Sequence, residues 1–110
     1  MMIVALRTRL RKGHEAEYKR DHARIPKDLV AAFRDVGISG WRIWRSGRDL
    51  FHVVECKDWQ SASATLSRMP AEHAWQTHIG KHLEQPTDDD GTPLALVAHE
   101  VWDLSKQLES

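Results

Sequence analysis

The sequence has little cysteine, no net charge and no long apolar run, and each shortage excludes a class of protein. A single cysteine, Cys56, cannot form an internal disulfide, which is typical of a reducing cytoplasm. The 16 basic and 16 acidic residues cancel, and no basic stripe suited to nucleic acid stands out. No run approaches the roughly 20 apolar residues that span a bilayer, and the amino terminus lacks a signal-peptide pattern. We therefore expect a cytoplasmic protein without membrane or nucleic-acid partners.

Motifs for several kinds of chemistry are also missing. The sequence has no glycine-rich phosphate loop and no serine in the glycine-flanked turn of a nucleophilic hydrolase. Seven histidines raise the question of a metal, and His78 and His82 have the i, i+4 spacing of two ligands on one helix. A tetrahedral site needs three or four ligands, and the spacing indicates no third one. We therefore expect no metal and no cofactor, with these histidines on the surface of a helix.

Hydrophobic periodicity divides the chain into strands and helices. The length of 110 residues predicts one domain over residues 1–110. Alternation and β-forming residues predict strands, and helical spacing with proline and glycine breaks predicts helices. The predicted strands cover residues 2–10, 41–45, 50–56 and 94–104; the predicted helices cover 14–36 with an interruption at Pro26, 58 or 61 to about 68, and about 71–83; a polar loop covers 86–93, and a frayed tail covers about 105–110.

The order of these elements predicts the fold. β-α-β-β-α-β is the split βαβ pattern, so we predict an α+β, ferredoxin-like fold with an antiparallel four-stranded sheet and helices on one face. The other face of the sheet then needs a cover, and five tryptophans in so small a chain suggest that a partner provides it. A homodimer that packs sheet to sheet is the simplest arrangement.

Two polar side chains lie on the apolar stripe of the first helical stretch. The stripe has steps of four or three residues and consists of Tyr18, His22, Ile25, Leu29, Phe33 and Val36. Because buried polar groups need partners, a phenol and an imidazole that both face inward suggest a pocket. The alternative is a core histidine that bonds to the tyrosine or to a backbone carbonyl. The spacing alone leaves both interpretations open.

Because motifs for phosphate binding, nucleophilic hydrolysis and metal binding are missing, we expect general acid–base chemistry in an aromatic-walled pocket. His22 is the candidate catalytic residue, since an imidazole gives and takes protons near neutral pH. Tyr18, one turn away, is placed to bond to it or to a ligand hydroxyl. Trp41 and Trp75 are candidates for stacking against a sugar ring, and Gln76 offers both a donor and an acceptor. The alternative for each tryptophan is packing in the core or in a dimer.

The chain resembles the L-rhamnose mutarotases over nearly its whole length. The resemblance lies in the order and spacing of several short motifs, none of them very specific alone. These are Glu17-Tyr18-x-x-x-His22 followed by Pro26, Gly37-x-x-x-Trp41-x-Ile43, Trp75-Gln76, and Glu100-Val101-Trp102-x-Leu104.

This resemblance implies a dimeric α+β barrel in which the sheets of two ferredoxin-like subunits face each other. It also implies interconversion of the α and β anomers of a 6-deoxy-L-hexose, L-rhamnose or L-fucose in type, without a cofactor. His22 then matches the family's proton donor, and Tyr18, Trp41, Trp75 and Gln76 match residues that contact the sugar. The chain departs from the family at Trp41, where tyrosine is common, at Gln76, where some members have tryptophan, and at Ile25, where tryptophan is common.

Two other classes of function remain open at this stage. The first is a different enzyme on the same barrel: a cofactor-independent monooxygenase, a haem-degrading protein or a cyclase. The second is a non-catalytic module that binds a small ligand. Fold alone does not separate these functions from a mutarotase.

Overall fold

The computed structural model describes residues 1–84 and 96–109. The elements in chain order are β1 (Met2–Arg9), α1 (Glu15–Asp21), α2 (Lys27–Asp35), β2 (Ile38–Ser46), β3 (Asp49–Cys56), α3 (Trp59–Leu66), α4 (Pro70–Gly80), β4 (Leu96–Ala98) and α5 (Leu104–Glu109). None of the helices in the described residues is long and apolar enough to cross a bilayer.

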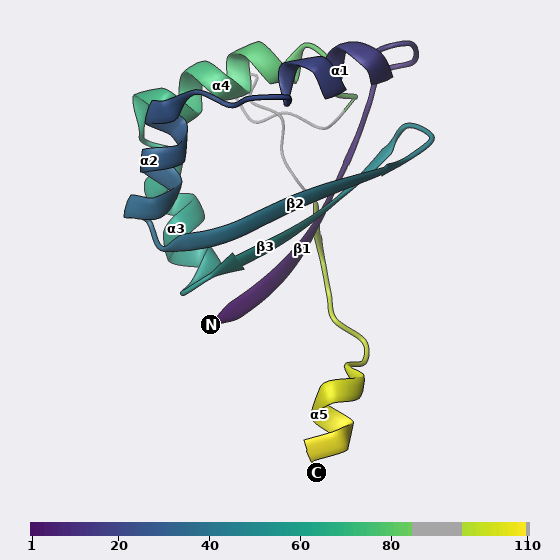
Figure 1. The fold of residues 1–110 in the computed structure, drawn as a ribbon, viewed down its shortest axis with the longest axis vertical. Coiled ribbons are helices and arrows are strands. Elements are labelled where there is room, and N and C mark those ends of the chain that lie inside the picture. Colours follow the sequence, from purple (N-terminus) through teal and green to yellow (C-terminus); the bar gives the residue numbers. More distant parts are fainter. Residues whose placement is uncertain (85–95, 110) are drawn as a thin grey trace.

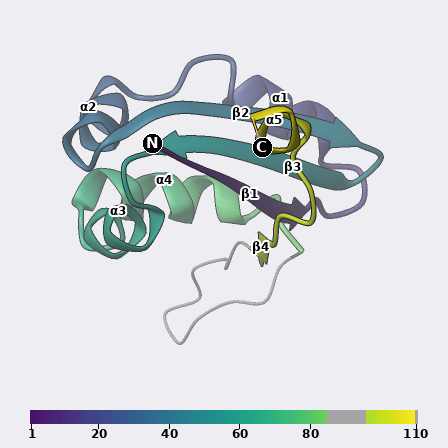
Figure 2. The same ribbon diagram turned by 90° about the horizontal axis from the view of Figure 1, so that it is seen from below.

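The strands form one antiparallel sheet in the order β2-β3-β1-β4. The four helices α1 to α4 cover one face of this sheet (Figure 1). Figure 2 looks onto the opposite face, which no helix of this layer covers. The predicted α+β, ferredoxin-like architecture is therefore confirmed. The β2–β3 hairpin turns at Gly47, whose φ of 61° is in the left-handed region that glycine adopts without a steric penalty.

Proline and glycine set the helix boundaries as the sequence predicts. The helical stretch over 14–36 is interrupted before Pro26, which precedes the first residue of α2. His22 ends α1, and Gly37 with a φ of 87° follows α2. Of the two possible caps of α3, the structure has Asp58, whose carboxylate accepts hydrogen bonds from the backbone N–H groups of residues 60 and 61.

The carboxyl-terminal end differs from the prediction. Of the expected strand over 94–104, residues 94 and 95 lie outside the described residues, and the described part forms a strand only over β4. Leu104–Glu109 forms α5 in place of a frayed tail. Among the described residues, β4 pairs with residues 5–7 of β1 only, and the chain beyond Ala98 leaves the sheet although β1 runs on to Met2 (Figure 1). The Asp103 carboxylate then accepts a hydrogen bond from the backbone N–H of Ser105 at 2.9 Å, which favours a helix start. The predicted loop over 86–93 lies outside the described residues.

The core beneath the helices consists of two separate groups of buried side chains. The α2–α3 cluster comprises Val4, Leu6, Ala32, Ile38, Val54, Cys56, Ala62 and Leu66. The α1–α4 cluster comprises Leu10, Tyr18, Leu50, Ile79 and Leu83. Both use the inward face of β1 and β3, where alternate residues are buried.

Candidate active site

The residues between the two clusters on the inward face of the sheet are polar. Thr8 of β1 lies between Leu6 and Leu10, and His52 of β3 lies between Leu50 and Val54. Thr8 and His52 are both buried, and Oγ1 of Thr8 is 2.9 Å from Nε2 of His52. A hydrogen-bonded polar pair therefore separates two apolar regions at the centre of the sheet.

Trp41 fixes the protonation of His52. Its indole Nε1–H donates to Nδ1 of His52 at 3.1 Å, and an indole N–H is only a donor. Nδ1 must therefore carry a lone pair, which leaves the proton of the neutral ring on Nε2 to be donated to Thr8. Burial, together with a smaller contribution from a charge on His22, lowers the pKa of His52 to about 4. His52 is a neutral, fixed imidazole at neutral pH.

Tyr18 and His22 come together at the end of α1, as the helical spacing predicts. Their ring centroids are 4.2 Å apart, and Trp75 of α4 lies edge-on to His22 at 5.1 Å. Nδ1 of His22 is 3.1 Å from the carbonyl oxygen of Tyr18. Because a carbonyl only accepts, Nδ1 carries the proton of the neutral ring and Nε2 carries the lone pair. The backbone carbonyl thus accepts the hydrogen bond of one nitrogen of His22, which is the arrangement expected of a core histidine. The other nitrogen, Nε2, is left to bond to a ligand.

The surroundings of His22 favour its neutral form. Burial lowers its pKa below the ordinary value of 6.5, against opposing contributions from the Tyr18 carbonyl and the Asp21 carboxylate. Charges on His78 and His82 lower this pKa further. Burial also raises the pKa of Tyr18, so its side chain is a neutral phenol that donates or accepts hydrogen bonds.

Trp41 makes packing contacts and a hydrogen bond within the fold. It is half-buried, stacks on Phe33 at 5.2 Å and meets the edge of Trp59 at 5.9 Å. Its only N–H is used by His52. Trp41 therefore packs beside the α2–α3 cluster and orients His52, a residue that interacts electrostatically with His22.

Gln76 has a partner that the sequence analysis did not identify. Its Nε2 donates to Oε1 of Glu72, one turn earlier on α4, at 2.6 Å. The other carboxylate oxygen, Oε2, is buried, and none of the described residues bonds to it. Burial raises the pKa of Glu72, whereas the bond from Gln76 lowers it. Glu72, Gln76 and Ile79 have helical i, i+4, i+7 spacing, and Ile79 is buried against the sheet, so all three share the inward face of α4.

His82 was expected on the surface of a helix, and that expectation is wrong: His82 follows α4 and is only 1% exposed, whereas His78 is exposed as expected. Thr8, His52 and Glu72 are further polar residues of the interior that sequence reasoning missed. Each occupies an inward position in an otherwise apolar pattern: Thr8 and His52 alternate with buried leucine and valine, and Glu72 precedes Ile79 by seven residues. A polar residue at an inward position was the available signal. The sheet, its one-sided helical cover and these side chains define the class of protein: a ferredoxin-like domain with titratable groups in its interior.

The chain belongs to the L-rhamnose mutarotase family, whose model matches residues 3–104. It is therefore an enzyme of the isomerase class that acts on carbohydrates. An L-rhamnose mutarotase of Sinorhizobium medicae is 33% identical over 98 residues, which are 86% of this chain and 94% of that protein. One of Opitutus terrae is 31% identical over 94 residues, 84% of this chain and 88% of that protein.

A solved structure supports the same fold. The crystal structure of an L-rhamnose mutarotase from Formosa agariphila superposes with a TM-score of 0.79 at 19% identity, and covers 94% of this chain and 98% of that one.

Proposed function

We propose that this enzyme interconverts the α and β anomers of a 6-deoxy-L-hexose, L-rhamnose or L-fucose in type, by opening and reclosing the pyranose ring. The names of its relatives give the substrate class. The observation that carries the chemistry is the hydrogen bond from Nδ1 of His22 to the Tyr18 carbonyl, because it leaves Nε2 of a neutral imidazole with a lone pair.

His22 is proposed to move one proton between two oxygens of the sugar. Nε2 accepts the proton of the anomeric hydroxyl while the bond between the anomeric carbon and the ring oxygen breaks. The electron pair of that bond goes to the ring oxygen, and the anomeric carbon and its oxygen become the aldehyde. The imidazolium then donates its proton to the ring oxygen, which becomes a hydroxyl, and His22 returns to its neutral form.

Rotation of the aldehyde and reversal of these steps close the ring on the other face. Both oxygens are bonded to the same carbon, so one nitrogen serves as acceptor and then as donor. His22 is in this way the proton donor to the ring oxygen, and a separate base is not required. Positioned acid–base groups of this kind contribute roughly 10²- to 10⁴-fold to a rate.

The remaining residues of the proposed site bind and orient the sugar. Tyr18 contributes a phenol hydroxyl, and Trp75 contributes an aromatic wall beside His22. Gln76 has its carbonyl oxygen in addition to the N–H group that Glu72 uses. Trp41 contributes the wall of the pocket through its packing and holds His52.

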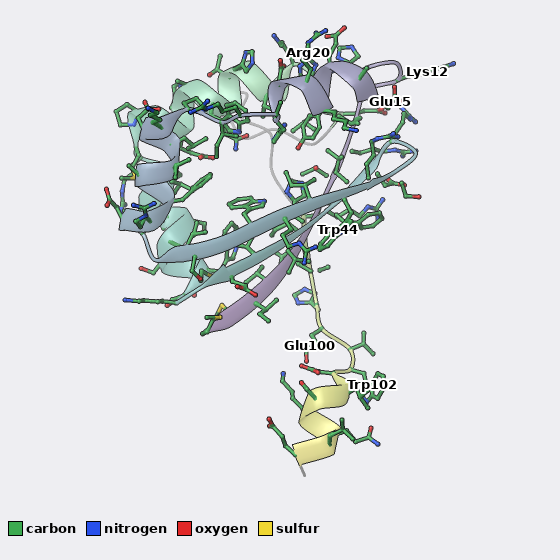
Figure 3. All side chains as sticks on the ribbon, viewed as in Figure 1. Lys12, Glu15, Arg20, Trp44, Glu100 and Trp102 are labelled. Atoms are coloured by element: carbon green, nitrogen blue, oxygen red, sulfur yellow. The ribbon has the colours of Figure 1, made fainter. Side chains whose placement is uncertain are left out.

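We further propose that the enzyme is a homodimer in which the uncovered sheet faces meet. Ile3, Trp44 and Phe51 are exposed on the sheet, and the Arg42 guanidinium lies 4.7 Å from the centre of the Trp44 ring system. Figure 3 shows Trp44 on the side of the sheet away from the helices. Exposed apolar side chains at this density mark an interaction surface.

Val101 and Trp102, on the segment that leads to α5, are exposed as well. Sedimentation at micromolar concentration should give twice the chain mass. A monomer at that concentration would contradict the dimer.

Saturation-transfer NMR on a panel of sugars tests the proposed activity. Saturating the anomeric proton of one anomer should reduce the signal of the other in the presence of enzyme, most strongly for L-rhamnose or L-fucose. D-glucose serves as the control sugar, and its exchange should stay near the uncatalysed rate. Equal, uncatalysed rates for every sugar in the panel would contradict the proposal.

A further inference from the structure

A second group of titratable side chains lies where the start of α1 meets the end of α4, outside the proposed sugar site. His14 precedes the first residue of α1, Glu17 lies in its first turn, and His82 follows α4. Each of the three residues offers one ligand atom, and these three atoms all lie within 4.8 Å of one another. We propose that His14, Glu17 and His82 bind a divalent transition-metal ion of the Zn²⁺ type.

The protonation of His82 favours this proposal. His82 is only 1% exposed, and its Nε2 is 2.8 Å from Oδ2 of Asp21. An ionised carboxylate only accepts hydrogen bonds, so Nε2 carries the proton and Nδ1 carries a lone pair. A histidine that donates one N–H to a carboxylate and offers its other nitrogen is the usual form of a metal ligand. Asp21 is thus the group that orients the ligand and is not itself a ligand.

The Nδ1 atoms of the two imidazoles face each other. Nδ1 of His14 lies 2.9 Å from Nδ1 of His82, across 68 residues of sequence. In the metal-free protein one proton, carried by His14, must lie between these nitrogens, since His82 uses its proton on Asp21. A metal ion replaces this proton and is bonded by both lone pairs, and the proton is released to solvent.

The distances suit a tetrahedral ion. With metal–nitrogen bonds of about 2.0–2.1 Å, two ligand atoms of a tetrahedral site are about 3.3 Å apart. The His14–His82 separation is 2.9 Å, and the separation between Nδ1 of His82 and Oε2 of Glu17 is 3.8 Å. These two separations lie within about half an ångström of the tetrahedral value. The third separation, between the ligand atoms of His14 and Glu17, is up to 4.8 Å, and a rotation of the exposed Glu17 side chain would close it. A water molecule would take the fourth position.

The ligand set also selects the metal. Two imidazoles and one carboxylate suit Zn²⁺, Co²⁺, Ni²⁺ or Cu²⁺, whereas Mg²⁺ and Ca²⁺ prefer oxygen ligands alone. Bound there, the ion would join the amino-terminal end of α1 to the segment after α4. Tyr18 lies on the same helix, with its ring 6.4 Å from that of His82. The spacing of histidines along one helix does not indicate this site, because His14 and Glu17 come from the other end of the chain.

The test is metal binding by the full, untagged chain after dialysis against a chelator. Calorimetric titration with Zn²⁺ should give one ion per chain, and Co²⁺ should produce the visible absorption of a tetrahedral site. His14→Ala changes a half-buried residue and Glu17→Gln an exposed one, and circular dichroism checks the folding of both variants. His14→Ala should weaken Zn²⁺ binding by more than about 100-fold, and Asp21→Asn by about 10- to 100-fold.

His78→Ala is the matched control. His78 is an exposed histidine of α4 whose Nε2 lies 3.4 Å from the same Asp21 oxygen, but it is not one of the three ligands. Its replacement should leave the affinity and the Co²⁺ spectrum unchanged. Absence of stoichiometric binding would overturn the proposal, and so would binding that survives His14→Ala but is lost in His78→Ala. Because every readout is metal binding, the result does not depend on the proposed sugar chemistry.

Discussion

The two ends of the helical layer pack on the same face of the sheet but differ in the side chains beneath them. Under α2 and α3, the α2–α3 cluster is made entirely of apolar residues. Under α1 and α4, the α1–α4 cluster is smaller and is bordered by His22, His52 and His82. Apolar burial contributes most of the stability of a small domain, whereas buried polar groups need partners and are retained where function requires them. We therefore expect mutations at the first end to change stability and mutations at the second to change chemistry.

The largest effect should come from His22→Ala, beside the α1–α4 cluster. The exchange rate of the anomers should fall by roughly 10²- to 10⁴-fold, which is the usual contribution of a positioned acid–base group. The midpoint of unfolding should change little, because His22 is only half-buried at the end of α1. Saturation-transfer NMR and urea unfolding measure the two quantities. Wild-type exchange in the variant would show that another group moves the proton.

The pH dependence of the wild-type rate supplies a further check on His22. Neutral His22 is the reactive form, so the rate should fall as acid protonates Nε2. The midpoint of this fall should lie below 6.5, because burial lowers the pKa of His22. Asp21, His52, His78 and His82 interact electrostatically with it, so the midpoint belongs to the coupled group. His73→Ala, a change of an exposed histidine on α4, should leave the profile unaltered.

Leu66→Ala tests the α2–α3 cluster, where we expect a mutation to change stability and not chemistry. Leu66 is buried in the α2–α3 cluster, and such a truncation costs about 2–5 kcal/mol of unfolding free energy. Exchange per folded molecule should remain near the wild-type value, since the side chain is in the other cluster. Urea unfolding and NMR exchange at a temperature where the variant is folded measure the two. A large loss of exchange in a folded Leu66→Ala protein would show that the two ends are not independent.

The sequence predicted the helical side of the site, with Tyr18 and His22, better than the side on the sheet, with His52. Tyr18 and His22 are four residues apart on one helix, so helical geometry alone places them together, and the family resemblance adds Trp75. The bonds of His52 depend instead on how three strands align, with Leu6 and Ile43 opposite it. An alternating pattern shows which face a residue occupies but not which residue of the next strand lies beside it. The same limit applies to β4: the alternating pattern continues beyond Ala98, but the chain leaves β1 there although β1 runs on to Met2.

A pH titration of stability tests the polar pair at the boundary of the two clusters. The pKa of His52 is about 4 in the folded protein and near 6.5 in the unfolded chain. Between these values the unfolded chain binds a proton that the folded protein does not. His52 therefore contributes stability that is present above pH 6.5 and is lost as the pH falls toward 4, by about 3 kcal/mol in total.

Urea unfolding between pH 4 and 7 measures this loss. His52→Leu should remove this part of the pH dependence and should also lower stability at pH 7, because Thr8 and the Trp41 N–H lose their partner. His73→Ala is the control, since His73 is exposed. An unchanged pH dependence in His52→Leu would show that His52 is not buried in a neutral form.

The smallest effect should come from Tyr18→Phe, which removes one hydroxyl from the α1–α4 cluster. The phenyl ring retains the contacts of the original ring with His22 and His82, so folding and the position of His22 should be preserved. One hydrogen bond to the sugar contributes about 0.5–1.5 kcal/mol, so kcat/KM should fall by roughly tenfold or less. The midpoint of the acid limb should stay where it is in the wild type, since the backbone carbonyl of residue 18 still accepts the Nδ1–H of His22. A loss as large as that of His22→Ala would mean that the Tyr18 phenol takes part in the proton transfer and does not only bind the sugar.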